Sequence, residues 1–370
     1  MRLCNNALLA IFLAGAALAL TAQQTASPSS AASGVGGVSS APARNESQTP
    51  LTPLTVDRDP VRSPDAESPA AAPAPLRKQG EGYVLHTDVE EVVLNATVLE
   101  GARLVPDLKK ENFEVFEDGV KQTLISFQHT DVPVSIALVV DNSGSMMRKR
   151  PSVNKSTLDL IQASNPQDEA FVVNFSDEAF IDQEFTSDIN KLRDGLSHIE
   201  SRGGTALYDA VVASADKLVA DAKRGKQVLI LITDGEDNAS TLNLEQTIRR
   251  VQQLSGPVVY SIGLLFGDEM SRAEVRHARR ALEMLSAETG GMAFFPKNIE
   301  QIDPISAEVA RDIRNQYTLG YHSTKPTTEP GFRRVLVTAQ GKGGKLTVRT
   351  RTGYFPVMRT ASKSVASSEK

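Results

Sequence analysis

Residues 133–145 read PVSIALVVDNSGS, and this stretch decides the fold. The run from Ser135 to Val140 is short, apolar and rich in β-branched side chains, which predicts a strand buried on both faces. Polar residues follow at once, with Asp141, Ser143 and Ser145 at alternate positions of a tight turn. Ligands of open α/β sheets bind outside the carboxyl ends of the strands, so we expect a site at this turn.

The spacing of these three oxygen-bearing side chains suits a hard divalent cation. Mg²⁺ prefers oxygen ligands in a near-octahedral array, uses few carboxylates and keeps exchangeable positions. Alternate residues of a tight turn can direct three oxygens at one point, and Gly144 permits a backbone that a larger residue would strain. An Asx or Ser turn that caps the next helix would use the same residues, so residues 141–145 alone leave both interpretations open.

Two later stretches place a hydroxyl and a carboxylate at similar points. GGTAL at 203–207 puts Thr205 at the start of a predicted helix, and LILITDGED at 229–237 is a second apolar strand that ends in Asp234. With these residues the chain resembles the von Willebrand factor type A domain and its metal-ion-dependent adhesion site. The family pattern of Asp-x-Ser-x-Ser, a distant Thr and a more distant Asp is met, within residues 132–316, by Asp141, Ser143, Ser145, Thr205 and Asp234.

The resemblance implies a divalent cation held by these five residues, with Mg²⁺ first and Mn²⁺ or Ca²⁺ as alternatives. It also implies a protein partner that supplies an acidic group to the ion. The charges of Asp141 and Asp234 would balance those of the ion, which leaves an open position that attracts an anion. In the family the second Asp often acts through water, so a direct role is expected of Asp141 before Asp234.

Strands and helices alternate from Pro133 to Gln316, which indicates an α/β fold with a doubly wound, mainly parallel sheet of the type A, Rossmann-like kind. The segments before and after it are predicted as β, with Val120 to Phe127 as one return strand of a hairpin. Each segment is too small to be stable alone, so we expect them to pair into a small β-sandwich. VPDLKKENFEVFEDG at 105–119 and YTLGYH at 317–322 resemble a secreted acidobacterial subfamily of type A domains.

The predicted domain boundaries follow from these changes in composition. They are residues 1–22 for a signal peptide, 23–80 for a disordered Ser/Ala/Pro-rich linker, 83–130 for the N-terminal β segment, 132–316 for the type A-like domain, 317–356 for the C-terminal β segment and 357–370 for a disordered tail. The linker holds about half of the prolines and almost no large apolar residues, so it cannot bury enough surface to offset the entropy of ordering.

The N-terminus predicts secretion. Arg2 precedes an apolar run from Leu8 to Leu20, and small residues follow up to Ala22. An uncleaved anchor is the alternative, although the run is short for a full span. We therefore expect the chain in the periplasm or outside the cell, with no stable membrane span after cleavage. The single cysteine, Cys4, lies in the signal, so the mature chain would hold no disulfide.

Composition argues against other classes of protein. The net charge is −5 over 370 residues, with no tryptophan and no long basic run, which disfavours nucleic-acid binding. A metal-dependent hydrolase needs a base or a second metal, but the histidines lie outside the motif and Asp237 is expected as an exposed loop carboxylate. No GxSxG surrounds Ser143 or Ser145. A non-enzymatic protein-binding module is favoured, with an assembly scaffold in an envelope complex as the alternative.

A basic cluster, Arg148-Lys149-Arg150, follows the metal turn directly. It has two interpretations at this stage. It is either the solvated start of a helix or a patch that steers an acidic partner towards the ion.

We predict that signal cleavage leaves a mature N-terminus at about Gln23, because small residues follow the apolar run there. N-terminal sequencing of protein recovered from the cell exterior measures this directly. Intact Met1, or protein found only in the cytosol, would contradict it.

Overall fold

The computed structural model describes residues 91–356, except residue 164, residues 199–201, residue 255, residues 268–269 and residue 342. Ahead of residue 91 it describes four short strands, β1 (Leu54–Val56), β2 (Asp59–Val61), β3 (Lys78–Gln79) and β4 (Gly82–Tyr83). The predicted signal peptide and C-terminal tail lie outside the described residues. Strands β1 to β3 fall within the predicted linker, so regular structure occurs in part of it. None of the helices in the described part has both the length and the apolar character needed to cross a bilayer.

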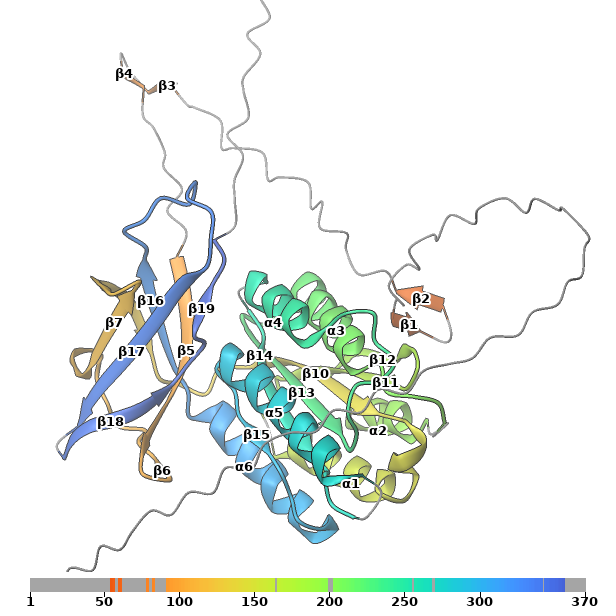
Figure 1. Ribbon diagram of the computed structural model, residues 1–370. Coiled ribbons are helices and arrows are strands. Elements are labelled where there is room, and N and C mark those ends of the chain that lie inside the picture. Colours follow the sequence, from red (N-terminus) through yellow and green to blue (C-terminus); the bar gives the residue numbers. More distant parts are fainter. Residues whose placement is uncertain are drawn as a thin grey trace, which may run out of the picture. The chain divides into compact units, whose positions relative to one another are not determined.

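The α/β region is built around β10 (Val134–Asp141), the strand that the apolar run predicts (Figure 1). Every residue of β10 is buried, and the strand pairs in parallel with a neighbour on each side. The strand order of this sheet is β15-β14-β13-β10-β11-β12-β1-β2. Its other strands are β11 (Glu169–Phe175), β12 (Ala179–Thr186), β13 (Lys226–Thr233), β14 (Val258–Gly263) and β15 (Ala293–Phe294).

The chain runs from β10 to β11 and β12 on one side, then to β13, β14 and β15 on the other. The strand order therefore reverses at β10. Strand β12 is antiparallel to β11, whereas the pairings from β11 through β15 are parallel. In sheets of this kind the crevice at the reversal point, beyond the carboxyl ends of the strands, receives the ligand.

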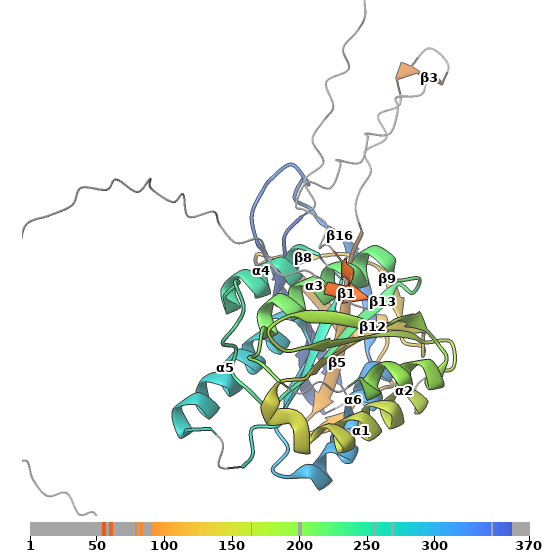
Figure 2. The same ribbon diagram turned by 90° about the vertical axis from the view of Figure 1, so that its right-hand side faces the viewer.

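Side chains of β10 alternate between two apolar cores, as the two-residue period of a strand requires. Ile136 and Leu138 pack with α1, α2 and α6, whereas Ala137 and Val139 pack with α3, α4 and α5. Figures 1 and 2 both show α1, α2 and α6 grouped together and away from α3 and α4. The helices are α1 (Arg150–Gln162), α2 (Ile189–Ser197), α3 (Leu207–Asp221), α4 (Leu244–Gln253), α5 (Arg272–Thr289) and α6 (Ile302–Arg314).

Local sequence signals set several helix ends. The Asp188 side chain accepts a hydrogen bond from the backbone N–H of Asn190 and caps α2. Ser271 and Glu274 form a capping box on α5, which ends at Gly290 with a left-handed φ of 91°. Short 3₁₀ turns at Lys110–Asn112 (η1), Gly144–Arg148 (η2) and Ile299–Gln301 (η3) complete the helical elements.

The segments that flank the α/β region meet in a second, antiparallel sheet. Its order is β8-β7-β17-β18-β5-β16-β9, with β19 paired to β17 and β6 paired to β5. Strands from the two ends of the chain are therefore interleaved in this sheet. They are β5 (Glu91–Glu100), β6 (Arg103–Leu104), β7 (Phe113–Glu117), β8 (Val120–Gln122), β9 (Leu124–Gln128), β16 (Tyr317–His322), β17 (Arg333–Gly341), β18 (Gly344–Arg349) and β19 (Gly353–Tyr354).

The predicted single return strand from Val120 to Phe127 is wrong in one respect. The structure divides it into β8, which pairs with β7, and β9, which pairs with β16. Residue 123 separates them, so only the first half forms the hairpin. Both halves still lie in the same sheet, because the pairing of β16 with β5 and with β9 joins the two ends of the chain.

Deleting Phe332–Phe355 should expose the β7–β8 hairpin to protease, because β17 is the only neighbour of β7 apart from β8 in the described sheet. Limited proteolysis with mass spectrometry is expected to show new cuts within residues 113–122, while residues 134–314 stay protected. A chain that ends at residue 356 is the control. Equal protection of the hairpin in the deletion and the control would show that β17 does not shield it.

Candidate metal centre

Four of the five residues predicted as ligands lie at or just beyond the carboxyl ends of β10 and β13, and the fifth lies in the loop before α3. Asp141 is the last residue of β10, and Ser143 and Ser145 begin η2. Asp234 directly follows β13, the parallel neighbour of β10. Thr205 lies two residues before α3. Residues far apart in the sequence thus meet because the two strands end at the same edge of the sheet.

A chain of polar contacts joins four of the five side chains. Ser143 Oγ and Ser145 Oγ are 3.1 Å apart. The Ser145 hydroxyl donates to Asp234 Oδ1 at 2.8 Å. The backbone N–H of Ser143 donates to Asp141 Oδ1 at 2.8 Å. The carboxylates of Asp141 and Asp234 therefore lie on either side of a pair of serine hydroxyls.

The spacing of these oxygens fits a small divalent cation. In an octahedral magnesium site each oxygen is about 2.1 Å from the ion, so neighbouring oxygens lie about 3 Å apart. The two hydroxyl contacts, at 3.1 and 2.8 Å, are close to ordinary hydrogen-bond lengths and are also compatible with that separation. No group of three or more His, Cys, Asp or Glu side chains suited to a metal ion occurs in the described residues, and this donor set instead combines two carboxylates with hydroxyls. Such a set favours Mg²⁺ over softer metals.

Asp141 is completely buried, and burial raises its pKa to about 6. Hydrogen bonds from Thr233 and Ser143 oppose this shift, and the nearby charge of Asp234 adds to it. Thr233 Oγ1 donates to Asp141 Oδ2 at 2.5 Å, and Asp141 Oδ1 accepts from the backbone N–H of Ser143. A divalent cation would relieve the repulsion between the two carboxylates.

Thr205 faces the same opening as Ser145 and Asp234. These three residues line a cavity of about 350 Å³, together with Lys149 and residues 235–238 and 264–267. Two hydrogen bonds hold Thr205 against the loop after β13: its N–H donates to Asn238 Oδ1 at 2.8 Å, and its carbonyl accepts from Asn238 N at 3.1 Å. Asn238 therefore fixes the position of a predicted ligand, although no sequence pattern had singled it out.

The basic cluster is not the solvated surface that either sequence interpretation requires. Lys149 is 7% exposed, and its ammonium pairs with Asp234 Oδ2 at 2.6 Å. Arg150 is fully buried and donates to Asn174 Oδ1 at 2.8 Å. Burial lowers the pKa of Arg150 to about 10, while the charges of Asp141 and Asp182 oppose that shift. Only Arg148 of the three is exposed. Two of these cations therefore balance buried carboxylates.

Asp209 is a second residue that the sequence did not single out. It is 5% exposed in the first turn of α3, where its carboxylate accepts hydrogen bonds from Thr241 N at 2.9 Å, Thr241 Oγ1 at 3.0 Å and Leu242 N at 3.0 Å. These bonds tie the loop after β13 to the helix that follows Thr205. The available signal was an acidic residue in the first turn of this helix, where the helix dipole favours a negative charge.

Two groups bear on the question of a catalytic base. Asp237 is not an exposed loop carboxylate: it is half-buried and accepts from Ser240 Oγ at 2.5 Å and Tyr208 N at 3.2 Å. Burial raises its pKa, and these hydrogen bonds lower it in part. His277 contacts Glu236, a residue that lines the cavity, but the His277 side chain is 65% exposed and is not part of the cavity lining.

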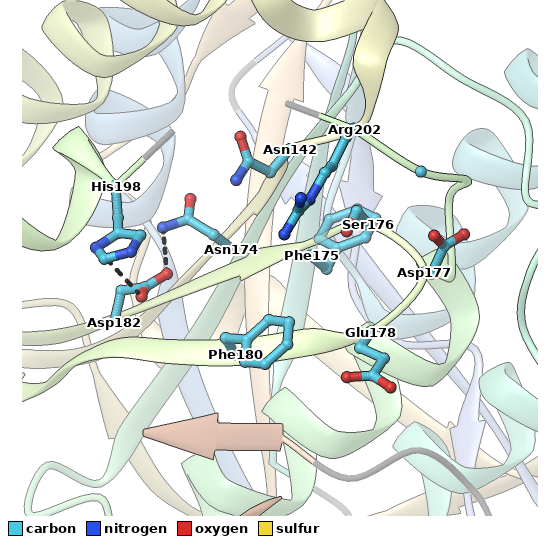
Figure 3. Close-up of a pocket in the computed structure, with 11 residues that line it drawn as sticks. Asn142, Asn174, Phe175, Ser176, Asp177, Glu178, Phe180, Asp182, His198 and Arg202 are labelled. Atoms are coloured by element: carbon cyan, nitrogen blue, oxygen red, sulfur yellow. Dashed lines mark hydrogen bonds and ion pairs between the residues drawn. The ribbon is translucent and has the colours of Figure 1, made fainter. Parts of the chain in front are cut away.

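A second hollow, of about 500 Å³, adjoins the centre on the β11 side (Figure 3). Asn142, the residue between two predicted ligands, lines it together with Phe180, Asp177 and Arg202. Within it, Asn174 Nδ2 donates to Asp182 Oδ2 at 2.7 Å, and His198 lies 4.0 Å from the same carboxylate. The surface beside the centre is therefore concave and rich in polar groups.

Comparison with known proteins agrees with the sequence resemblance. Residues 136–236 match the family model for the von Willebrand factor type A domain. Among solved structures, an aerotolerance-related membrane protein from Bacteroides fragilis is 18% identical, with 49% of this chain and 98% of that chain covered and a TM-score of 0.41. A von Willebrand factor type A protein from Catenulispora acidiphila is 13% identical, with 69% of this chain and 75% of that chain covered and a TM-score of 0.42. Proximal thread matrix protein 1 from the mussel byssus, with a zinc-occupied MIDAS motif, is 19% identical, with 54% of this chain and 50% of that chain covered and a TM-score of 0.42. No curated protein matches the chain.

Asp209→Ala should lower the free energy of unfolding by about 2–3 kcal/mol, because it leaves two backbone N–H groups and a hydroxyl without their charged acceptor. Hydrogen exchange should quicken at the amides of Thr241 and Leu242. Asp209→Asn keeps one acceptor oxygen and should lose less.

Asp221→Ala, at the exposed end of the same helix, is the control for this experiment and should stay within about 0.5 kcal/mol of the wild type. If Asp209→Ala unfolds like this control and leaves both amides equally protected, Asp209 does not hold the loop.

Proposed function

From the von Willebrand factor type A match at residues 136–236, we propose that this protein is a secreted or periplasmic, metal-dependent protein-binding module. It captures an acidic group of a partner protein through a divalent cation, Mg²⁺ first. The observation that supports this most directly is the set of oxygens around Ser145, which contacts Ser143 Oγ at 3.1 Å and Asp234 Oδ1 at 2.8 Å. Their spacing and chemistry suit a hard cation.

The five residues have different roles in this proposal. Asp141, Ser143 and Ser145 hold the ion, because they are fixed at the end of a fully buried strand and in the turn that follows. Asp234 completes the negative charge from the neighbouring strand. Thr205 faces the cavity from another loop and approaches the ion when a partner binds. The bound cation supplies a Lewis-acid position for an incoming carboxylate.

The partner meets a concave surface as well as the ion. The cavity at the centre and the hollow beside Asn142 lie on either side of the metal turn. Residues next to the partner's acidic group therefore have polar surface to contact on both sides, which supports specificity beyond one carboxylate. The signal-like N-terminus supports the secreted or periplasmic location in this proposal. The resemblance of residues 105–119 and 317–322 to the acidobacterial subfamily stays a prediction.

A metal-dependent hydrolase is less well supported. The nearest candidate bases are Asp237, whose oxygen accepts from Tyr208 N and Ser240 Oγ, and His277, which is exposed beside Glu236. Asp237 lines the cavity beside Ser145, but its Oδ1 already accepts these two hydrogen bonds, and His277 is not part of the cavity lining. An assembly scaffold would use the same metal-bridged contact, so it differs from adhesion only in which partner is captured.

Asp141→Ala should weaken Mg²⁺ or Mn²⁺ binding by at least about a hundredfold, because loss of a group that merely supports a ligand already costs about 10- to 100-fold. Titration calorimetry of the full chain measures this. Thr205→Ala removes a neutral oxygen and should weaken partner capture more than cation binding. Crosslinking mass spectrometry on native cells, with and without chelator, identifies the partner and measures its capture.

Asp216→Ala is the matched control, since the Asp216 side chain is 1% exposed and paired with Arg250 away from the centre. It removes a buried carboxylate and should leave cation affinity unchanged. Partner capture that is insensitive to chelator and equal in Asp141→Ala would defeat the metal-bridged mechanism.

A further inference from the structure

Lys149 forms an ion pair with Asp234, one of the predicted ligands. Its Nζ donates to Asp234 Oδ2 at 2.6 Å, and Ser145 occupies the other oxygen of the same carboxylate. The side chains of Lys149 and Asp234 are 9% and 0% exposed, so solvent screens their interaction little. The ammonium also lies 5.3 Å from the ring centroid of Phe266, an aromatic face that favours a cation.

The position of Lys149 follows from the turn that carries the serines. It comes four residues after Ser145, and its N–H donates to the carbonyl of Met146 as η2 ends. In a 3₁₀ turn residues three apart eclipse, so a spacing of four does not align two side chains by itself, yet both of these side chains contact Asp234. Ser145 and Lys149 therefore reach Asp234 together, and any shift of the turn moves both.

The charges at the centre then compete. Asp141 and Asp234 contribute two negative charges, and Lys149 contributes one positive charge within hydrogen-bond distance of Asp234. A divalent cation near Asp234 would be repelled by the ammonium and would compete with it for the carboxylate. The oxygens of Asp141 accept hydrogen bonds from Ser143 and Thr233, whereas Asp234 accepts directly from the Lys149 ammonium.

Resting on the proposed function, we propose that Lys149 is a built-in competitor for the divalent cation. Its ion pair with Asp234 weakens cation binding. Asp141, Ser143 and Ser145 are then the main ligands of the ion. Lys149 is thus a positioning residue that sets how strongly the centre binds its cation.

The test compares Mg²⁺ and Mn²⁺ titrations of the full chain by calorimetry. Lys149→Met keeps the apolar stem and removes the charge, and it should bind either ion about tenfold more tightly than the wild type. Lys149→Gln keeps a donor for Asp234 without the charge and should tighten binding in the same direction. Lys149→Arg retains the charge and should stay within about threefold of the wild type.

Lys217→Met is the matched control. The Lys217 side chain is 7% exposed, pairs with Glu184 and Asp221, and lies 5.8 Å from the ring centroid of Phe171. It matches Lys149 in burial, pairing and aromatic contact, but lies ten residues into α3 beyond its start, about 15 Å along the helix axis. Its substitution should leave cation affinity unchanged.

Thermal unfolding gives a second measurement that a purely structural lysine would not produce. Without added cation Lys149→Met should melt lower than the wild type, because Asp234 loses its partner, and Mg²⁺ should raise its melting temperature more than that of the wild type. If Lys149→Met does not fold, the Lys149→Gln titration decides the matter.

Outcomes separate the two proposals. Equal cation affinity in the wild type, Lys149→Met and Lys149→Gln would overturn the role of Lys149 while leaving the metal-dependent module intact. An equal gain in Lys217→Met would also overturn it, since the effect would then be one of net charge alone. Absence of cation binding in the wild type and in both variants would overturn the proposed function and this inference together.

Discussion

Asp141 carries a carboxylate that is completely buried at the end of a strand covered on both faces, and the neighbourhood is arranged around that charge. A buried carboxylate needs hydrogen bonds or opposite charge, and here it receives the first from Ser143 and Thr233. Arg150, also buried, adds a positive charge whose interaction with Asp141 opposes the effect of burial on the pKa of the arginine. The turn, the neighbouring strand and the first helix are thus all coupled to one side chain.

The second carboxylate adds a different requirement. Asp234 ends the strand next to β10, so the parallel pairing that stabilises the sheet also brings two like charges together. Lys149 and Ser145 each take one of its oxygens. The same geometry that suits a divalent cation therefore already contains a positive charge from the chain itself.

Hydrogen bonds between neighbouring loops fix the geometry of the centre. Asn238 fixes Thr205 from the loop after β13, and Asp209 fixes that loop from the helix after Thr205. In the flanking sheet a buried carboxylate has a comparable part: Glu117 accepts hydrogen bonds from the hydroxyls of Tyr321 and Tyr354, both at 2.8 Å. It joins the N-terminal strand β7 to the C-terminal strands β16 and β19.

By itself the sequence determined the central strand, the order of strands and helices, and the five residues that gather at its end. A continuous apolar run is buried on both faces wherever it lies, and residues at the carboxyl ends of adjacent parallel strands meet by geometry alone. Tertiary structure decided the rest, because it depends on which side chains are close in space. A run of three basic residues looks solvated, yet packing buries Lys149 against Asp234 and Arg150 against Asn174. The division of residues 120–127 into two strands likewise reflects partners supplied by the other end of the chain, which no local pattern contains.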